Sequence, residues 1–146
     1  MKIVVSPNPY RDKQFKNARQ ACSILREAGA EVALCLPFDV DKTFEIPHDL
    51  RFQDVQKEIK MADMLICFGG DGTILHSSKI ATEHNLPILG VNIGTMGFIA
   101  ELEAGEIELL RKIPKGDYTV EERTMLDVSV GNGRQTLFHE TALNDA

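Results

Sequence analysis

The fold of this chain follows from the stretch Met64–Thr73, whose sequence is Met-Leu-Ile-Cys-Phe-Gly-Gly-Asp-Gly-Thr. Its apolar half, Met64–Phe68, has the length of a buried strand, and Ile74–Ala81 predicts the start of a helix. Glycines at such a turn let the backbone approach another group closely because they have no Cβ. The N–H groups and dipole at the start of the helix favour phosphate. The stretch therefore predicts a strand, a phosphate-binding turn and a helix.

Asp71 needs a separate explanation, because a carboxylate alone would repel phosphate. It is suited to holding a metal ion or to accepting a proton from an attacking hydroxyl. The alternative is a tight turn in which the side chain of Asp71 or Thr73 caps the helix. Gly-Asp-Gly alone does not separate these interpretations, but the full Gly-Gly-Asp-Gly-Thr string behind a strand favours phosphate chemistry.

Composition limits the classes of function. The 146 residues are 43% hydrophobic and 26% charged, which is typical of one globular domain with a real core. A net charge of −6 argues against a general nucleic-acid surface. Met1-Lys2 leads directly into a strand and no apolar run approaches membrane-spanning length, so we predict no signal peptide, no membrane and a cytoplasmic location.

The cysteines and histidines indicate neither disulfides nor a metal centre. Cys22, Cys35 and Cys67 are odd in number, far apart and in apolar surroundings, which predicts buried free thiols. The four histidines have no metal-ligand spacing with them.

Apolar periodicity predicts a doubly wound α/β fold, with a mostly parallel sheet and helices on both faces. The expected strands are Lys2–Ser6, Glu31–Leu36, Met64–Phe68 and Pro87–Val91. The expected helices run from Asp12 to Gly29, from Phe52 to Ala62, from Ile74 onward and from Ile107 to Ile113. Ligands of such sheets bind at the carboxyl ends of the strands, so the two glycine-rich turns, Gly69–Thr73 and Asn92–Phe98, are expected to share one crevice.

The last part of the chain changes its pattern. A period-2 stretch from Tyr118 to Val130, the turn Gly131–Gly133 and a return strand Leu137–Leu143 predict a β-hairpin. We therefore expect an α/β nucleotide-binding domain at residues 1–116 and, at 117–146, a hairpin that starts a truncated second, β-rich domain. The chain stops directly after a polar pair, so we expect it to be the front part of a longer protein.

Four segments together resemble the ATP-dependent NAD kinases in order and spacing. They are Gly69–Thr73, Asn92–Phe98 (Asn-Ile-Gly-Thr-Met-Gly-Phe), Glu122–Leu126 (Glu-Arg-Thr-Met-Leu) and Ala142–Asp145 (Ala-Leu-Asn-Asp). The resemblance covers nearly the whole chain. The first segment is shared with diacylglycerol and sphingosine kinases, and a related one occurs in phosphofructokinases. The combination is more specific, and its Asn-Asp pair is the most discriminating element.

The resemblance implies phosphorylation of the 2′-hydroxyl of the adenosine ribose of NAD, giving NADP. It implies ATP as donor, a divalent ion such as Mg²⁺, NAD as substrate, small-molecule nucleotides as the partners, and a homo-oligomer when full length. Asp71 is the implied catalytic proton acceptor, and no residue is assigned as a metal ligand. The implied nucleotide-binding residues are Gly69, Gly70, Asp71, Gly72, Thr73, His76, Asn92, Met96, Gly97, Phe98, Asn144 and Asp145.

Some of these residues can also be explained by a simpler, structural role. Asn144 and Asp145 suit a turn after the hairpin, and Phe98 suits the core. His76 follows the glycine motif on the same helix face and can reach a phosphate, with a charge that depends on pH. Many members of the resembled family carry a basic residue at that position.

Three other functions compete with the NAD kinase interpretation. A lipid kinase shares the glycine motif but predicts an apolar entrance and no Asn-Asp pair. A dehydrogenase-type module requires Gly-x-Gly-x-x-Gly after the first strand, whereas Gly90, Gly94 and Gly97 have another spacing and follow a late strand. A non-catalytic nucleotide-binding fragment is the third alternative, because the resembled family continues into a second, mostly β domain with further NAD contacts and the subunit interfaces.

Overall fold

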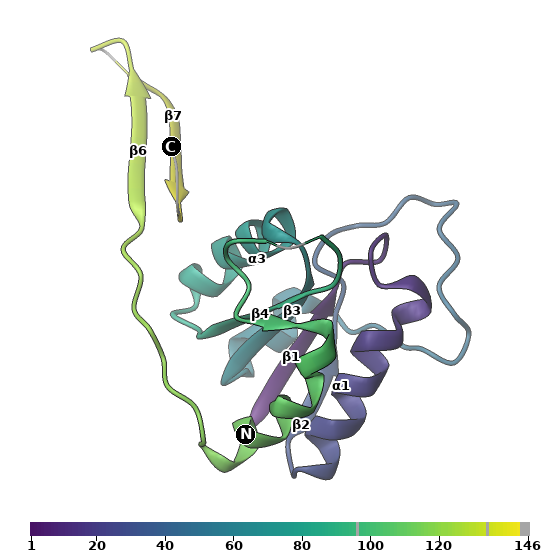
Figure 1. Ribbon diagram of the computed structural model, residues 1–146. Coiled ribbons are helices and arrows are strands. Elements are labelled where there is room, and N and C mark those ends of the chain that lie inside the picture. Colours follow the sequence, from purple (N-terminus) through teal and green to yellow (C-terminus); the bar gives the residue numbers. More distant parts are fainter. Residues whose placement is uncertain (96, 134, 144–146) are drawn as a thin grey trace.

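The main body is a parallel sheet with helices on both faces, as the sequence predicts, and its five strands are one more than expected (Figure 1). The computed structural model describes residues 1–95, 97–133 and 135–143. The strand order is β2-β1-β3-β4-β5, and all four pairings are parallel. The strands are β1 (Lys2–Pro7), β2 (Glu31–Leu34), β3 (Met64–Gly69), β4 (Ile88–Asn92) and β5 (Leu102–Glu103).

Helices cover the two faces of this sheet in separate apolar layers. In Figure 1, α1 (Lys16–Glu27) and η3 (Ala104–Lys115, green) lie together on one face while α3 (Asp71–Glu83) lies on the other. Because β3 is central and covered on both sides, all six of its residues are buried, which explains its uninterrupted apolar sequence. The helical elements are η1 (Lys13–Phe15), α1 (Lys16–Glu27), α2 (Val55–Glu58), η2 (Ile59–Met61), α3 (Asp71–Glu83) and η3 (Ala104–Lys115).

The first helix is confirmed, with a start that differs from the expected one. Asp12 is fully buried, and its carboxylate accepts the backbone N–H of Asn17 at 3.0 Å and of Ala18 at 2.9 Å. Asp12 therefore binds amides at the start of the helix, as expected. Regular α-helix begins only at Lys16, because Gln14 and Phe15 have φ angles of 53° and 56°. Gly29 ends the helix in the left-handed region, with φ at 95°.

Two predicted helices form in altered shape. The segment expected to be helical from Phe52 is helical only from Val55, since Gln53 pairs with Cys35 in a β-bridge and Asp54 caps the turn that follows. The helix expected at Ile107–Ile113 is present but longer, and it is a 3₁₀ helix from Ala104 to Lys115.

The C-terminal hairpin forms its own antiparallel sheet of β6 (Leu126–Gly131) and β7 (Thr136–Ala142). The predicted first strand is wrong before Leu126, because residues 118–125 have no regular structure. Figure 1 shows the hairpin at the end of this extended segment. An ion pair of 2.8 Å between Lys79 of α3 and Glu140 of β7 links it to the main body. The domain boundary expected after residue 116 stays a prediction.

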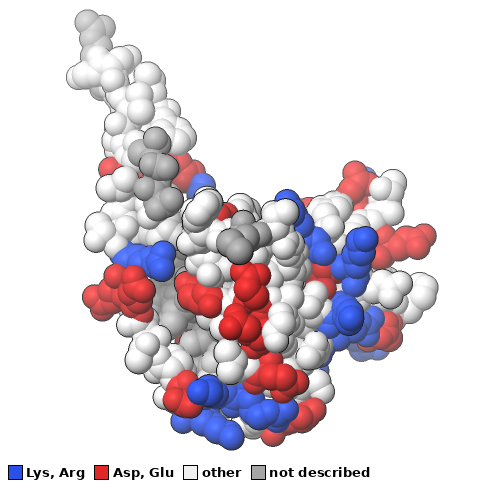
Figure 2. Space-filling model, in the orientation of Figure 1, with Lys and Arg blue, Asp and Glu red and all other residues white. Residues whose placement is uncertain are grey.

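Charged side chains of both signs are mixed over the surface that Figure 2 displays. No single sign of charge dominates the face in this view. None of the helices formed by the described residues is both long enough and apolar enough to cross a bilayer.

Candidate functional site

A cleft of about 510 Å³ opens at the carboxyl ends of the central strands. The chain places β2 on one side of β1 and β3 on the other, so the strand order reverses between β1 and β3. Such reversal points are where open α/β sheets bind their ligands. The cleft is lined by Asn8, Arg11, Phe38, Gly70, Asp71, Gly72, Thr73, His76, Thr95 and Gly97.

The turn between β3 and α3 uses its glycines in two ways. A Cβ on Gly69 would overlap the side chain of Thr73, so this position needs glycine for close packing. Gly70 and Gly72 instead have nothing within 4 Å of the point where a Cβ would stand, and both line the cleft. Their missing side chains leave open space in front of the first turn of α3.

The helix start itself is left uncapped. Helix α3 begins at Asp71 with Gly70 at the N-cap position, and no side chain among the described residues caps it there. The alternative in which the side chain of Asp71 or Thr73 caps this helix is therefore wrong. N–H groups at such a terminus are left for water or a ligand, and the helix dipole favours an anionic one.

Asp71 is held from the side by the second glycine-rich loop. One carboxylate oxygen accepts the N–H of Phe98 at 3.1 Å, and the other accepts the N–H of Ile99 at 3.3 Å. A Cβ on Gly97 would overlap Oδ1 of Asp71, so only glycine leaves room for this contact. The structure therefore brings the two glycine-rich turns together at one carboxylate.

Thr73 is fixed by a residue that the sequence reasoning missed. Its hydroxyl accepts a hydrogen bond of 2.8 Å from the side-chain amide of Asn8, and the carbonyl of that amide accepts the N–H of Tyr10 at 3.0 Å. Asn8 and Arg11 both lie just after β1. The signal was available, since Pro7-Asn8-Pro9 ends the first strand and a strand next to the reversal point places its following loop at the site.

His76 lines the cleft and also contacts the loop that follows β2. Its Nε2 lies 3.0 Å from the carbonyl oxygen of Pro37, and a carbonyl can only accept, so this nitrogen carries a proton. The ring also meets Phe38 edge-on, with centroids 5.8 Å apart. These contacts attach the loop after β2 to α3, and Phe38 continues into an aromatic stack with Tyr10.

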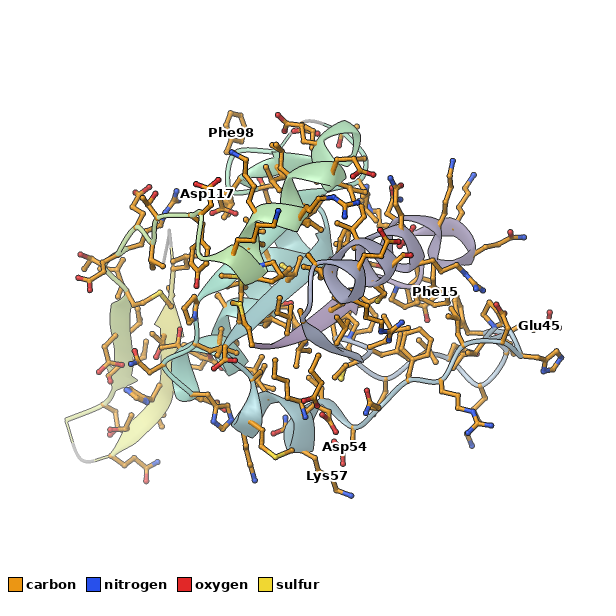
Figure 3. All side chains as sticks on the ribbon, turned by 90° about the horizontal axis from the view of Figure 1, so that it is seen from below. Phe15, Glu45, Asp54, Lys57, Phe98 and Asp117 are labelled. Atoms are coloured by element: carbon orange, nitrogen blue, oxygen red, sulfur yellow. The ribbon has the colours of Figure 1, made fainter. Side chains whose placement is uncertain are left out.

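The remaining predicted residues separate into two groups. Asn92 is buried, and it donates to Glu103 at 3.0 Å and to the carbonyl of Thr95 at 3.1 Å, so it shapes the second loop from behind the cleft. Phe98 is 98% exposed and points away from the body in Figure 3, so the core interpretation of this residue is wrong. Met96, Asn144 and Asp145 lie outside the described residues.

The three thiols are free and buried, as predicted, and none lines the cleft. Burial raises the pKa of Cys22 to about 11 and the pKa of Cys35 and of Cys67 to about 12. Such thiols stay protonated at neutral pH and carry no nucleophilic chemistry.

Comparison with known proteins now identifies the family. A family model described as the ATP-NAD kinase N-terminal domain matches residues 2–118. The chain belongs to the NAD kinase family. Its relatives include the NAD kinase of Natranaerobius thermophilus, 45% identical over 93 residues that make up 63% of this chain and 32% of the relative. The NAD kinase of Caldanaerobacter subterraneus subsp. tengcongensis is 32% identical over 99% of this chain and 50% of the relative.

A solved kinase structure shares the fold. The structure of yeast NADH kinase complexed with NADH superposes with a TM-score of 0.71 at 20% identity, over 99% of this chain and 47% of that chain. This chain spans half the length, or less, of the curated NAD kinases named above. The glycine turns and Asp71 lie inside the range that the family model matches.

Proposed function

We propose that this chain forms the nucleotide-binding part of an enzyme that transfers a phosphoryl group from ATP to the 2′-hydroxyl of the adenosine ribose of NAD, giving NADP. The observation that carries the proposal is the uncapped start of α3, which faces an open cleft and places Asp71 beside it. Membership of the NAD kinase family supports the choice of ATP and NAD as the substrates. The cleft volume of about 510 Å³ lies within the range typical of small-molecule sites.

The glycine turn is suited to binding the phosphates of the donor. Gly70 and Gly72 leave the space that a phosphate needs, and the first N–H groups of α3 supply hydrogen-bond donors. Phosphoryl transfer depends mainly on positioning and on neutralising negative charge. A rigid turn of backbone donors provides both without a large positively charged surface, which an acidic chain lacks.

Asp71 is suited to the role of proton acceptor. An ionised carboxylate has about four lone-pair sites, and the amides of Phe98 and Ile99 occupy two of them. The remaining lone pairs can accept the proton of a ribose hydroxyl as it attacks the transferred phosphoryl group. The two amide contacts fix the orientation of the carboxylate, so little rearrangement is needed at the moment of transfer.

A magnesium ion fits this donor set as a companion of the nucleotide. Within the described ranges, no three His, Cys, Asp or Glu side chains gather as a metal centre. Mg²⁺ usually keeps several waters and binds through substrate phosphates, so the phosphates of the donor would hold it in this cleft and Asp71 stays the proton acceptor. When bound, the ion would neutralise charge on the phosphates.

Several assignments extend this proposal. Met96, Gly97 and Phe98 would line the adenine side of the site, and Asn144 with Asp145 would bind a ribose of NAD. The exposure of Phe98 supports a role in contacting a ligand, because a fully exposed aromatic ring gains by being covered. A homo-oligomeric state and a cytoplasmic location also stay part of the proposal.

The polar cleft favours a nucleotide over a lipid. Phe38 is the one large apolar side chain among its described lining residues, and the others are polar, charged or glycine. A lipid kinase would need an apolar entrance for an acyl chain. The shared glycine motif therefore supports a kinase, while the lining supports a nucleotide substrate.

Calorimetric titration of the 146-residue chain with ATP and Mg²⁺, and separately with NAD, tests the proposal. An NADP-formation assay on this chain and on the longest product of its gene completes the experiment. We expect saturable ATP binding to the chain and NADP formation by the longest product. Absence of both would refute the proposed function.

A further inference from the structure

Arg11 is a cation at the edge of the cleft that forms no ion pair with any residue the structure describes. It lines the cleft, and no described carboxylate lies within ion-pair distance of its guanidinium. Arg19, one turn into the following helix, instead forms a two-pronged pair with Asp49. An exposed arginine that reaches a cleft without a counter-ion leaves all five of its donors for a ligand.

The loop that carries Arg11 is fastened to three elements. The backbone N–H of Asn8 donates to the carbonyl of Phe68 in β3 at 2.8 Å, and its side chain donates to Thr73 in α3. The N–H of Arg11 donates to the carbonyl of Asn8 at 3.2 Å. The next residue, Asp12, is fully buried and accepts amides of α1. The backbone of Arg11 therefore has a fixed place relative to the glycine turn.

The guanidinium extends toward the second glycine-rich loop. Its Nη1 lies 3.3 Å from the point where a Cβ on Gly94 would stand, so this glycine gives it room. Arg11 thus reaches from the loop after β1 to the loop after β4. Strand β3, which leads into the glycine turn and α3, lies between β1 and β4 in the sheet. An anion bound at the start of α3 would lie within the same cleft as this cation.

We propose that Arg11 binds the phosphate chain of the nucleoside triphosphate, an inference that rests on the proposed function. The turn Gly69–Thr73 contains no basic residue, and Asp71 adds a negative charge that works against phosphate. Of the described residues that line the cleft, Arg11 alone carries a permanent positive charge. The planar guanidinium matches two phosphate oxygens at once, which an ammonium group cannot do.

The test compares Arg11→Gln with Arg51→Gln, an exposed arginine that does not line the cleft. Each variant and the unchanged chain are titrated with ATP and Mg²⁺, with inorganic triphosphate, and with adenosine. We expect Arg11→Gln to weaken ATP and triphosphate binding by roughly tenfold or more, the typical effect of losing hydrogen bonds to a charged group. Adenosine binding and the melting temperature should stay unchanged, and Arg51→Gln should change none of these quantities.

A third variant separates charge from shape. Arg11→Lys keeps the charge and loses the paired donors, so it should recover only part of the triphosphate affinity. Equal ATP and triphosphate binding by Arg11→Gln and the unchanged chain would overturn the inference while leaving the proposed function intact. Equal losses for adenosine and triphosphate would also overturn it, because they would indicate a distorted cleft. If the unchanged chain binds neither ATP nor triphosphate, the nucleotide site itself is refuted, and the role of Arg11 with it.

Discussion

Charged groups are arranged in opposite ways at the two ends of the parallel strands. We call the end at which the strands begin the amino edge of the sheet, and the end at which they finish the carboxyl edge. At the amino edge, the ammonium group of Lys2 pairs with Glu58 at 2.7 Å and with Glu31 at 3.2 Å, and its backbone N–H donates to Asp63 at 2.6 Å. At the carboxyl edge, Arg11 has no ion pair among the described residues, and Asp71 is held only by backbone N–H groups.

This difference separates groups that serve the fold from groups that serve a ligand. At the amino edge, the ammonium group of Lys2 has carboxylate partners, and these contacts connect β1 to β2 and to the segment before β3. Arg11 and Asp71 at the carboxyl edge stay available to a ligand. Parallel strands place the loops that follow them, and the first turn of the next helix, on that side of the sheet. The predictions below compare variants of the two edges, beginning with the largest expected effect.

Replacement of Asp71 by Asn should have the largest effect on activity. The variant keeps the shape of the side chain but removes the proton acceptor, a role worth typically 10²- to 10⁴-fold in rate. We expect NADP formation by the longest gene product to fall by about this factor, with NAD affinity changed by no more than a few-fold. Asp63→Asn at the opposite edge is the matched control and should keep normal turnover. Normal turnover in the Asp71 variant would exclude the role as base.

Replacement of Gly97 by Ala should displace the Asp71 carboxylate without unfolding the chain. The added Cβ overlaps Oδ1 of Asp71, so the carboxylate has to rotate away from the amides of Phe98 and Ile99. A shift of about 1 Å at a reacting group can cost on the order of 100-fold in rate. Gly105→Ala, where nothing lies within 4 Å of the new atom, is the control. Unchanged kcat in Gly97→Ala would show that the position of this carboxylate is unimportant.

Two glycines of the same turn should respond differently to alanine. Gly69→Ala places its Cβ against Thr73 and should lower the free energy of unfolding by about 1–3 kcal/mol, the usual cost of overpacking. Gly72→Ala meets no neighbour, so it should keep its stability and weaken ATP binding by filling space in the cleft. Denaturant unfolding and calorimetry measure the two effects. Equal stability losses in both variants would contradict the assigned roles.

Lys2 should give the smallest effect, a small gain in stability that disappears at high pH. Hydrogen bonds to Glu58 and Glu31 raise the pKa of Lys2 above its ordinary value of 10.5. Its contribution to stability is therefore complete below about pH 10.5 and is lost as pH rises through the raised pKa. Lys2→Met should lack this part of the alkaline loss of stability. The thiols also titrate in that range, but their contribution cancels when the two chains are compared. Identical alkaline unfolding profiles would contradict this prediction.

Much of the fold could be predicted because its signals are local. The buried strand Met64–Phe68 follows from its apolar run, and the end of the first helix follows from Gly29. One error arose where pairing between residues far apart in the sequence decided the structure. Gln53 pairs with Cys35, the residue that follows the edge strand β2, and this pairing shortens the helix expected from Phe52. No periodicity in the sequence predicts such a bridge.

The sequence predicted the glycine motif of the site but not all of the residues that surround it. Gly70, Asp71 and Gly97 were selected from the sequence, and the structure brings them together in one cleft. Asn8 and Arg11 were missed because their role depends on which strands are adjacent, a property of topology rather than of local pattern. Asn92 was selected for the site, yet its side chain faces Glu103 behind the loop.

The most direct test of this account is a backbone amide NMR titration of the chain with ATP and Mg²⁺. We predict saturable shift changes at the carboxyl edge, in residues 8–12, 70–73 and 94–99, and none at Lys2, Glu31 or Asp63. Saturable changes confined to the amino edge, or no changes at millimolar ATP, would contradict the central claim that the open carboxyl edge is the nucleotide site.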